Sequence, residues 1–284
     1  MSDKTVQNSD QRDFWTDEAG PIWVDQRAAM DALLAPILDS TLARAELQLG
    51  QSVLDIGCGA GTSTLAIAEQ IGETGHVTGI DISRTLLDEA LTRGLGKSNV
   101  AFLDADAQTH PLATGSADRI ASRFGVMFFG DSQAAFRNMS NALRDDGTMS
   151  FSAWGAIADN PFFTLPAQIA RQILGPVPKS DPDAPGPFAF RDPDVINNLL
   201  SSAGLSVEIN TVHEPLLWAE TPRDRARTMC MIGPAHIAIN HHEADAAMKE
   251  TLLDALSDAL SIYESETGLT IPAQINYVTA RKAT

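Results

Sequence analysis

The residues best suited to bind a ligand form a glycine-rich turn early in the chain. An apolar run over Ser52–Ile56 leads into the turn, and a helical pattern over Thr62–Gln70 begins directly after it. The turn consists of Gly57, Cys58, Gly59, Ala60 and Gly61. Because glycine has no Cβ, a ligand can approach such a turn closely. The sequence therefore predicts a ligand site where a strand passes into a helix.

Two acidic residues accompany this turn. Asp55 precedes it by two residues, and Asp81, followed by Ile82, ends the next apolar run, twenty residues after Gly61. A carboxylate at the end of the second strand can accept both hydroxyl hydrogens of a ribose. We therefore predict that Asp81 binds a ribose. Asp55 is either part of the ligand site or a cap for the following turn.

A later acidic position bears on the class of cofactor. Asp106 and Ala107 follow the third apolar run, where they offer a carboxylate for an exocyclic amine and a backbone N–H for an adjacent ring nitrogen. This pair suits an adenine. A nicotinamide dinucleotide site also has a glycine turn and a later acid, but its fingerprint is GxGxxG, whereas the sixth residue counted from Gly57 is Thr62. The pattern therefore favours a different adenosine cofactor.

The elements that position these residues are predicted to alternate between strand and helix. Five short apolar runs are typical of strands: residues 52–56, 76–81, 100–103, 118–123 and 149–154. Amphipathic segments lie between them, one capped by Ser83 and another by Asp131. This alternation predicts βαβ units with right-handed crossovers and a parallel sheet. Ligands of such sheets bind beyond the carboxyl ends of the strands.

The flanking segments are less regular. Residues 14–46 carry an apolar stripe interrupted by Pro36, so we expect a kink or two short helices there. Residues 156–191 are rich in proline and are predicted to form an ordered loop. The later elements expected are a helix over 192–203, a strand over 205–217, a helical insertion around 248–260 and a last strand over 271–281.

The core, residues 51–155, closely resembles class I S-adenosylmethionine-dependent methyltransferases, particularly those similar to ubiquinone- and menaquinone-biosynthesis methyltransferases. Residues 20–24 resemble them more loosely. The resemblance implies a Rossmann-like α/β fold, with a seven-stranded, mostly parallel sheet, helices on both faces and an antiparallel last strand. We expect an N-terminal helical segment closing over the site (1–50), a cofactor-binding core (51–155), and a helical substrate cap with the last strands (156–284).

The resemblance also implies S-adenosylmethionine as the cofactor. The turn would wrap its methionine part, Asp81 its ribose, and Asp106 and Ala107 its adenine, while backbone near Arg123 would meet its ammonium group. The cofactor-binding set is then Asp55, Gly57, Cys58, Gly59, Gly61, Asp81, Ile82, Asp106, Ala107 and Arg123.

The reaction expected is transfer of a methyl group to a small-molecule acceptor. Displacement at a sulfonium is in-line, so proximity and orientation can supply most of the catalysis. A phenol or alcohol would also benefit from a base, for which His110 is the candidate. Ligand positions beyond the strand ends predict that the acceptor pocket is lined by Trp23, Phe128, Trp154, Asn160 and Phe163.

The chain is strongly acidic, with 20 Lys+Arg against 37 Asp+Glu and a net charge of −17 over 284 residues. This balance argues against nucleic-acid partners, which need a basic face. The sequence has no apolar run of about 18 residues and its N-terminal stretch is polar, so we expect a cytoplasmic protein without a membrane partner, as a monomer or homodimer. The two cysteines and the spacing of the histidines predict no metal site.

Two other functions remain open at this level. One is a sensor or scaffold that binds S-adenosylmethionine without turnover, and the less favoured one is an NAD-dependent oxidoreductase.

Overall fold

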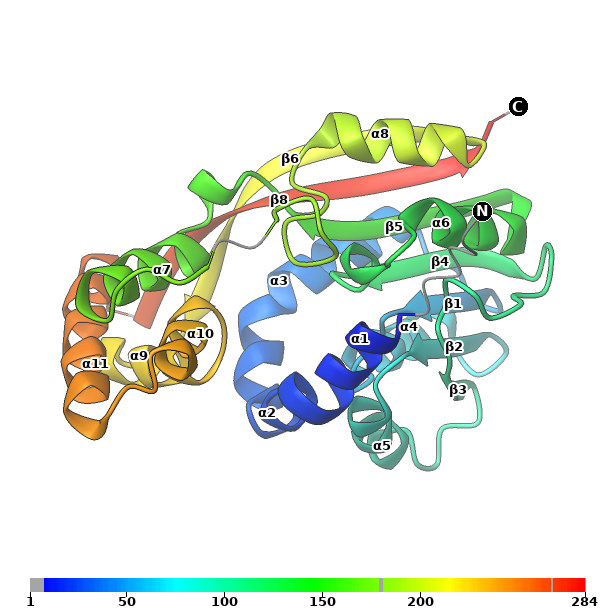
Figure 1. Cartoon of the computed structure of the whole chain (residues 1–284). Coiled ribbons are helices and arrows are strands. Elements are labelled where there is room, and N and C mark those ends of the chain that lie inside the picture. The colour runs from blue at the N-terminus through cyan, green and yellow to red at the C-terminus, as the bar shows by residue number, and fades with distance from the viewer. Residues whose placement is uncertain (1–7, 179–180, 267, 284) are drawn as a thin grey trace.

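The chain folds around one mostly parallel β-sheet, which the computed structural model describes over residues 8–178, 181–266 and 268–283 (Figure 1). Seven strands follow one another in the order β3-β2-β1-β4-β5-β8-β6, and only β8 runs antiparallel to its neighbours. Their bounds are β1 Ser52–Ile56, β2 His76–Asp81, β3 Val100–Asp104, β4 Ala117–Arg123, β5 Leu143–Trp154, β6 Leu205–Trp218 and β8 Gly268–Lys282. A two-residue strand, β7 Glu264–Ser265, pairs with β8. The seven-stranded, Rossmann-like prediction is confirmed.

Helices cover both faces of this sheet. On one face, α3 (Arg27–Ala45) and α4 (Thr62–Ile71) share an apolar cluster with Val53 and Val77. On the other, α6 (Ser132–Ala142) packs on β5 through Phe136 and Phe151, and α8 (Pro193–Ser202) contacts α6 and β6. Helix α5 (Arg84–Arg93) packs on β2 and β3. The predicted caps are present, since Ser83 accepts from the Leu86 N–H and Asp131 from the Ala134 N–H.

Helix α3 excludes one of the two arrangements expected around Pro36. It is a single helix that continues through Pro36 rather than two short ones. Proline removes one backbone hydrogen bond from a helix interior, at a cost of about 3 kcal/mol. Four fully or nearly buried side chains around it, Leu33, Leu34, Ile37 and Leu38, face the sheet. Their burial stabilises the helix enough to hold the proline in it.

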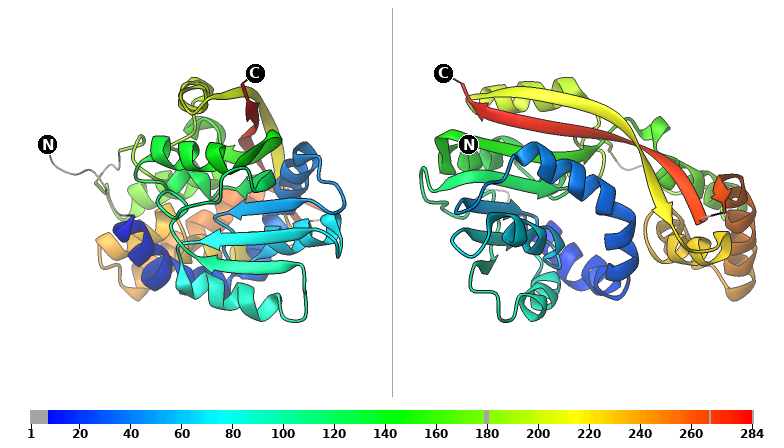
Figure 2. Two further views of the ribbon diagram at one scale, coloured as in Figure 1. Left: turned by 90° about the vertical axis from the view of Figure 1, so that its right-hand side faces the viewer. Right: turned by 180° about the vertical axis from the view of Figure 1, so that it is seen from behind.

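A lobe of four helices lies beyond the end of the sheet, at the far end of the long β6–β8 ribbon (Figures 1 and 2). It consists of α7 Pro161–Ile173, α9 Pro222–Met231, α10 Pro234–His241 and α11 Ala246–Leu260. Helix α7 corrects the expectation that residues 156–191 form only a loop. Proline at its first position suits a helix start, and buried Ile169 and Ala170 hold it in the lobe.

The N-terminal segment runs along the carboxyl-terminal edge of the sheet. It comprises α1 Ser9–Asp13, a π-helical turn over Phe14–Glu18 and α2 Ala19–Asp25. Two hydroxyl groups near the start of α5 hold it: Ser83 donates to the Trp15 carbonyl and Thr85 to the Thr16 carbonyl, each at 2.7 Å. Within the described residues, no helix is long and apolar enough to cross a membrane.

Candidate active site

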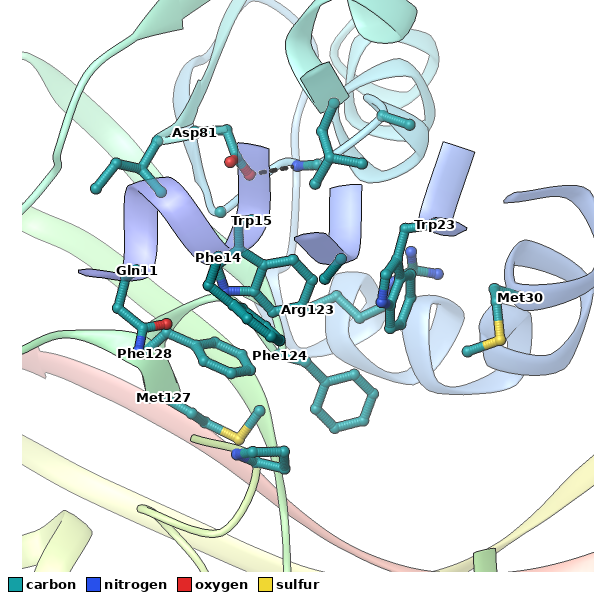
Figure 3. A pocket seen from close by; sticks show the side chains of 18 of the residues that line it. Gln11, Phe14, Trp15, Trp23, Met30, Asp81, Arg123, Phe124, Met127 and Phe128 are labelled. Carbon is teal, nitrogen blue, oxygen red and sulfur yellow. Dashed lines mark hydrogen bonds between the residues drawn. The ribbon is translucent and has the colours of Figure 1, made fainter. Parts of the chain in front are cut away.

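A cavity of about 620 Å³ lies among the strand ends, the N-terminal segment and the helical lobe. Its walls come from the glycine turn, the ends of β2, β3 and β4, helices α2 and α3, and the α9–α10 junction. Figure 3 shows Asp81 on one side of this space, Met30 on another, and aromatic rings between them. Segments far apart in the sequence therefore share one ligand-sized space.

The glycine turn is built for close approach. Gly57 has a φ of +66°, and a Cβ there would lie 2.5 Å from the Cα of Gly125. A side chain at position 57 would therefore collide with the loop after β4 and strain the backbone. Gly57, Cys58 and Gly59 line the cavity, as the sequence predicted, whereas Gly61 does not. Gly61 instead begins α4 at a φ of +84°, where a Cβ would crowd Ala90 and Phe102 at 3.0 Å.

Asp81 joins the turn to the end of β2. One carboxylate oxygen accepts the Gly59 N–H at 2.7 Å, and the other accepts the Ser83 N–H at 2.8 Å. Burial raises the pKa of this carboxyl, while the backbone N–H groups lower it. Asp81 and Ile82 both line the cavity. The carboxylate thus shapes the turn and retains free lone pairs for a ligand.

Asp55 lies behind the turn and does not line the cavity. Its Oδ2 atom accepts from the hydroxyls of Ser63 and Thr64, each at 2.6 Å, so it ties β1 to the first turn of α4. Burial raises its pKa to about 6, against the lowering effect of these hydroxyls. The geometry therefore favours a structural role for Asp55 over direct contact with a ligand. This placement matches the alternative in which the residue caps the turn.

The predicted adenine pair follows β3, the strand next to β2. Asp106 and Ala107 both line it, and Asp106 Oδ1 accepts from the Gln108 N–H at 2.9 Å. The same oxygen accepts from Asn8 Nδ2 at 3.2 Å, and Asn8 Oδ1 accepts from the Gly130 N–H at 2.7 Å. The start of the N-terminal segment therefore closes this end of the site.

Arg123 belongs to a cationic cluster around Asp31. Its Nη2 atom lies 3.5 Å from Asp31 Oδ1, and Arg27 and Arg93 approach Oδ2 at 3.4 and 3.8 Å. Glu89 pairs with Arg27, so three guanidinium groups share two carboxylates. The Nη1 atom of Arg123 is buried and has no hydrogen-bond partner among the described residues. This wall of the cavity therefore favours an anionic group.

Aromatic rings form the remainder of the cavity. Trp23, Phe128, Trp154 and Phe163, which the sequence predicts for the acceptor pocket, line it. Trp154 stacks on Phe124 with ring centroids 4.5 Å apart and an interplanar angle of 4°. Phe124 adopts a left-handed backbone with φ of +64°, a strained conformation of the kind that clusters at binding sites. The chamber suits an apolar, planar ligand.

Besides Asp55 and Gly61, two further predicted site residues, Asn160 and His110, lie outside the cavity wall. Asn160 is fully buried, and its Nδ2 donates to the Ala156 carbonyl while its Oδ1 accepts from the Gln274 N–H. It fastens the start of α7 to β8, so its assignment to the acceptor pocket is wrong. His110 follows the adenine loop on the outside, where Asn138 binds its carbonyl, and it does not line the cavity. The geometry does not bring His110 to a reacting group.

Several lining residues carried no recognisable pattern in the sequence. They are Asn8, Gln11, Phe14, Trp15 and Glu18 of the N-terminal segment, and His236 and Asn240 of α10. Trp15 contacts both Trp23 and Phe128 edge-on, at 5.9 and 5.1 Å between centroids. The π-helical turn that presents Trp15 is a feature enriched at functional sites, but nothing in the local residue types marks it. Among the described residues, no group of three His, Cys, Asp or Glu side chains is arranged to hold a metal.

Comparison with known protein families gives a match within the core of the chain. Residues 53–147 match the family described as "Methyltransferase domain". This match contains β1 to β4, the glycine turn and all the predicted cofactor residues. Over this segment the resemblance of the chain to methyltransferases is confirmed.

A curated relative of known name matches part of the chain. Demethylmenaquinone methyltransferase of Staphylococcus aureus is 33% identical over 98 residues, which are 34% of this chain and 41% of the relative. The match therefore spans about two fifths of the relative's length.

Two solved structures share the fold more widely. Phosphoethanolamine N-methyltransferase 2 of Haemonchus contortus, solved with phosphomonomethylethanolamine and S-adenosylhomocysteine, has a TM-score of 0.60 at 17% identity, covering 99% of this chain and 61% of that one. The YcgJ protein of Bacillus subtilis has a TM-score of 0.55 at 17% identity, covering 89% and 99%. At these identities the likeness shows the fold alone.

Proposed function

We propose that this protein transfers a methyl group from S-adenosylmethionine to a small-molecule acceptor. The observation that carries the proposal is the continuity of one cavity from the glycine turn and Asp81, past Arg123, into an aromatic chamber. Such a space can hold a charged nucleoside at one end and an apolar acceptor at the other. The methyltransferase-domain match over residues 53–147 supports the same reaction.

The residues present fit the cofactor part by part. Asp81 faces the ribose position, and Asp106 with Ala107 the adenine, while the Gly57–Gly59 turn leaves room for the chain that joins them. Arg123 and Arg27 offer guanidinium groups to the carboxylate of the amino-acid part. When bound, S-adenosylmethionine supplies an electrophilic methyl group. The chain's own residues orient the acceptor toward it and exclude water.

The domain layout follows from these contacts. The N-terminal segment would close over the cofactor through Asn8, Trp15 and Trp23, and the helical lobe would supply the cap over the acceptor through residues 231–240. Positioning by these parts would provide most of the rate acceleration, as expected for displacement at a sulfonium. A binding protein without turnover is the second candidate.

The experiment compares two ligands that differ in the amino-acid part. Calorimetry should detect binding of S-adenosylmethionine and of 5′-methylthioadenosine, which lacks the carboxylate and ammonium groups, but not of NAD. Arg123→Met should weaken S-adenosylmethionine binding by about 10-fold or more and leave 5′-methylthioadenosine nearly unchanged, because only the first ligand has an anion to pair. The exposed Arg84→Met serves as the control.

Transfer itself is measured with radiolabelled S-adenosylmethionine and a panel of phenol, amine, thiol and carbon acceptors. Transfer to any acceptor would exclude the sensor alternative. Tight binding without transfer to the whole panel would favour that alternative, and preference for NAD would overturn the cofactor assignment.

A further inference from the structure

The acceptor end of the cavity contains few polar side chains. Apart from the residues assigned to the cofactor, and the side chains that hydrogen-bond to them or begin α4, the polar side chains that line the cavity are Gln11 and Glu18 from the N-terminal segment and His236 and Asn240 from α10. The remaining surface there is aromatic or aliphatic. Isolated polar groups in such a chamber fix the orientation of a ligand. The α10 pair is the one that combines a basic atom with a hydrogen-bonding partner.

The hydrogen bonds of His236 define which of its nitrogen atoms is basic. Asn240 Nδ2 lies 2.9 Å from His236 Nε2, and because an amide nitrogen only donates, Nε2 accepts. His236 Nδ1 lies 3.3 Å from the Cys230 carbonyl oxygen, which only accepts, so Nδ1 carries the proton. This network assigns a neutral imidazole whose lone pair is on Nε2.

We propose that His236 Nε2 accepts the hydrogen bond, and then the proton, of a hydroxyl group on a planar, mostly apolar acceptor. This inference rests on the proposed methyltransferase function. The hydroxyl oxygen forms the new bond to the methyl carbon as the carbon–sulfur bond of the sulfonium donor breaks and its electron pair stays on sulfur. The hydroxyl proton moves to Nε2, and the Cys230 carbonyl stabilises the resulting imidazolium through Nδ1–H.

The surroundings of the pair fit both parts of this role. Trp15 contacts Trp23 and Phe128 edge-on, and these three rings line the same cavity as His236, where they offer ring surfaces to a flat body. Asn240 is exposed, so a hydroxyl can replace its amide at Nε2, and the proton can then pass to solvent. His110, the base expected from the sequence, has no access to this chamber.

A binding experiment tests the hydrogen bond without any turnover. Protein saturated with S-adenosylhomocysteine is titrated with 2-naphthol and with naphthalene, which differ by one hydroxyl group. The wild type should bind 2-naphthol about 3- to 10-fold more tightly, as one hydrogen bond gives. His236→Phe should lose this preference, and His110→Phe, outside the cavity, should keep it. No preference in the wild type, or one that survives in His236→Phe, would overturn the proposal.

A turnover experiment tests the proton transfer. The nitro group of 1-nitro-2-naphthol makes its hydroxyl acidic enough to be ionised at neutral pH, so that acceptor needs no base. His236→Gln should slow methylation of 2-naphthol by about 100-fold or more and that of the nitro compound far less. Equal losses on both acceptors would indicate a structural role only. If the wild type fails to bind S-adenosylmethionine at all, the proposed function fails instead, and the two failures are distinguishable.

Discussion

Asp81 combines a structural and a ligand-facing role in one carboxylate. Its two oxygens accept backbone N–H groups from the glycine turn and from the start of α5, and the side chain is 9% exposed at the cavity wall. A ribose would add charge-assisted hydrogen bonds to lone pairs that these contacts leave free. The affinity for S-adenosylmethionine should therefore depend on this one residue.

Asp81→Ala is predicted to weaken S-adenosylmethionine binding by about 10- to 100-fold, because it removes hydrogen bonds to a charged acceptor. Calorimetry on the folded variant measures this, with Asp88→Ala on the exposed side of α5 as the control. Unchanged affinity in a folded Asp81→Ala protein would remove the ribose assignment.

Asp55 gives stability a pH dependence. Burial raises its folded-state pKa from 3.8 to about 6, so the folded protein binds the proton more tightly than the unfolded chain. The favourable contribution is complete below pH 3.8 and is lost as the pH rises through 6. A shift of about two units corresponds to roughly 3 kcal/mol. Above pH 6 the ionised carboxylate remains buried at this cost.

Asp55→Asn is predicted to remove this dependence, because its amide oxygen can still accept from Ser63 and Thr64 without carrying charge. The difference in unfolding free energy between variant and wild type should shift in favour of the variant by up to about 3 kcal/mol from pH 4 to pH 7. Urea unfolding at both pH values measures it. A difference that does not change with pH would mean that Asp55 titrates normally.

At the residue scale, the sequence predicted the groups that belong to a recurring motif. Gly57, Gly59, Asp81 and Asp106 all line the cavity because the strand–turn–helix geometry fixes where they point. His236 and Asn240 face the same space, but only because the β6–β8 ribbon carries α10 back to it. Because this placement depends on contacts between distant parts of the chain, no local sequence pattern marks His236 and Asn240 as site residues.

At the element scale, strand–helix alternation was sufficient to predict β1 to β5, whereas the antiparallel direction of β8 was predicted from the family resemblance. The elements that the sequence did not predict correctly also have a physical explanation. Residues 161–173 were assigned to a loop on their proline content, yet Pro161 starts α7 and Pro166 is buried within it. Pro36 likewise lies inside α3. In both helices the burial of neighbouring side chains outweighs the local penalty of proline. That burial depends on the tertiary structure, so the local sequence does not predict it.

The aromatic stack between β5 and α7 is predicted to stabilise the fold as well as line the site. Trp154 is 6% exposed, stacks on Phe124 and meets Phe163 edge-on at 5.0 Å. Trp154→Ala should cost about 3–5 kcal/mol of stability, whereas S-adenosylmethionine affinity should stay within a few-fold of wild type. Urea unfolding and calorimetry on the same variant measure both. A stable variant that loses only turnover would assign Trp154 to the pocket wall alone.

The N-terminal segment and α10 are predicted to become more ordered when the cofactor site fills. Both line the cavity, and the start of the segment is joined to the cofactor end of the site by the Asn8 bridge between Asp106 and Gly130. Hydrogen exchange with S-adenosylhomocysteine should slow over residues 8–25 and 231–241. Helix α11, which lines no part of the cavity, should not change. Slowing confined to the glycine turn and Asp81 would mean that neither part closes over the cofactor.

At the scale of the whole molecule, charge is distributed unevenly. The chain carries −17 overall, yet the Arg27, Arg93 and Arg123 guanidinium groups converge on Asp31, which lines the cavity together with Arg27 and Arg123. These cations are partly buried and already share Asp31 and Glu89. They can pair with a small anion that enters the cavity, but they do not form a basic surface that follows a phosphate backbone.

Nucleic acids are therefore predicted not to bind. Polyanion affinity depends on surface Lys and Arg that release condensed counterions, and here 37 acidic residues oppose 20 basic ones. Filter binding against tRNA and duplex DNA at low salt is the most demanding test, because screening is then weakest. Arg223→Glu, on the exposed surface of α9 among acidic neighbours, is the matched variant, since it should change nothing. Micromolar, salt-sensitive binding by the wild type that Arg223→Glu abolishes would reveal a basic patch and make an RNA or DNA acceptor a serious alternative to a small molecule.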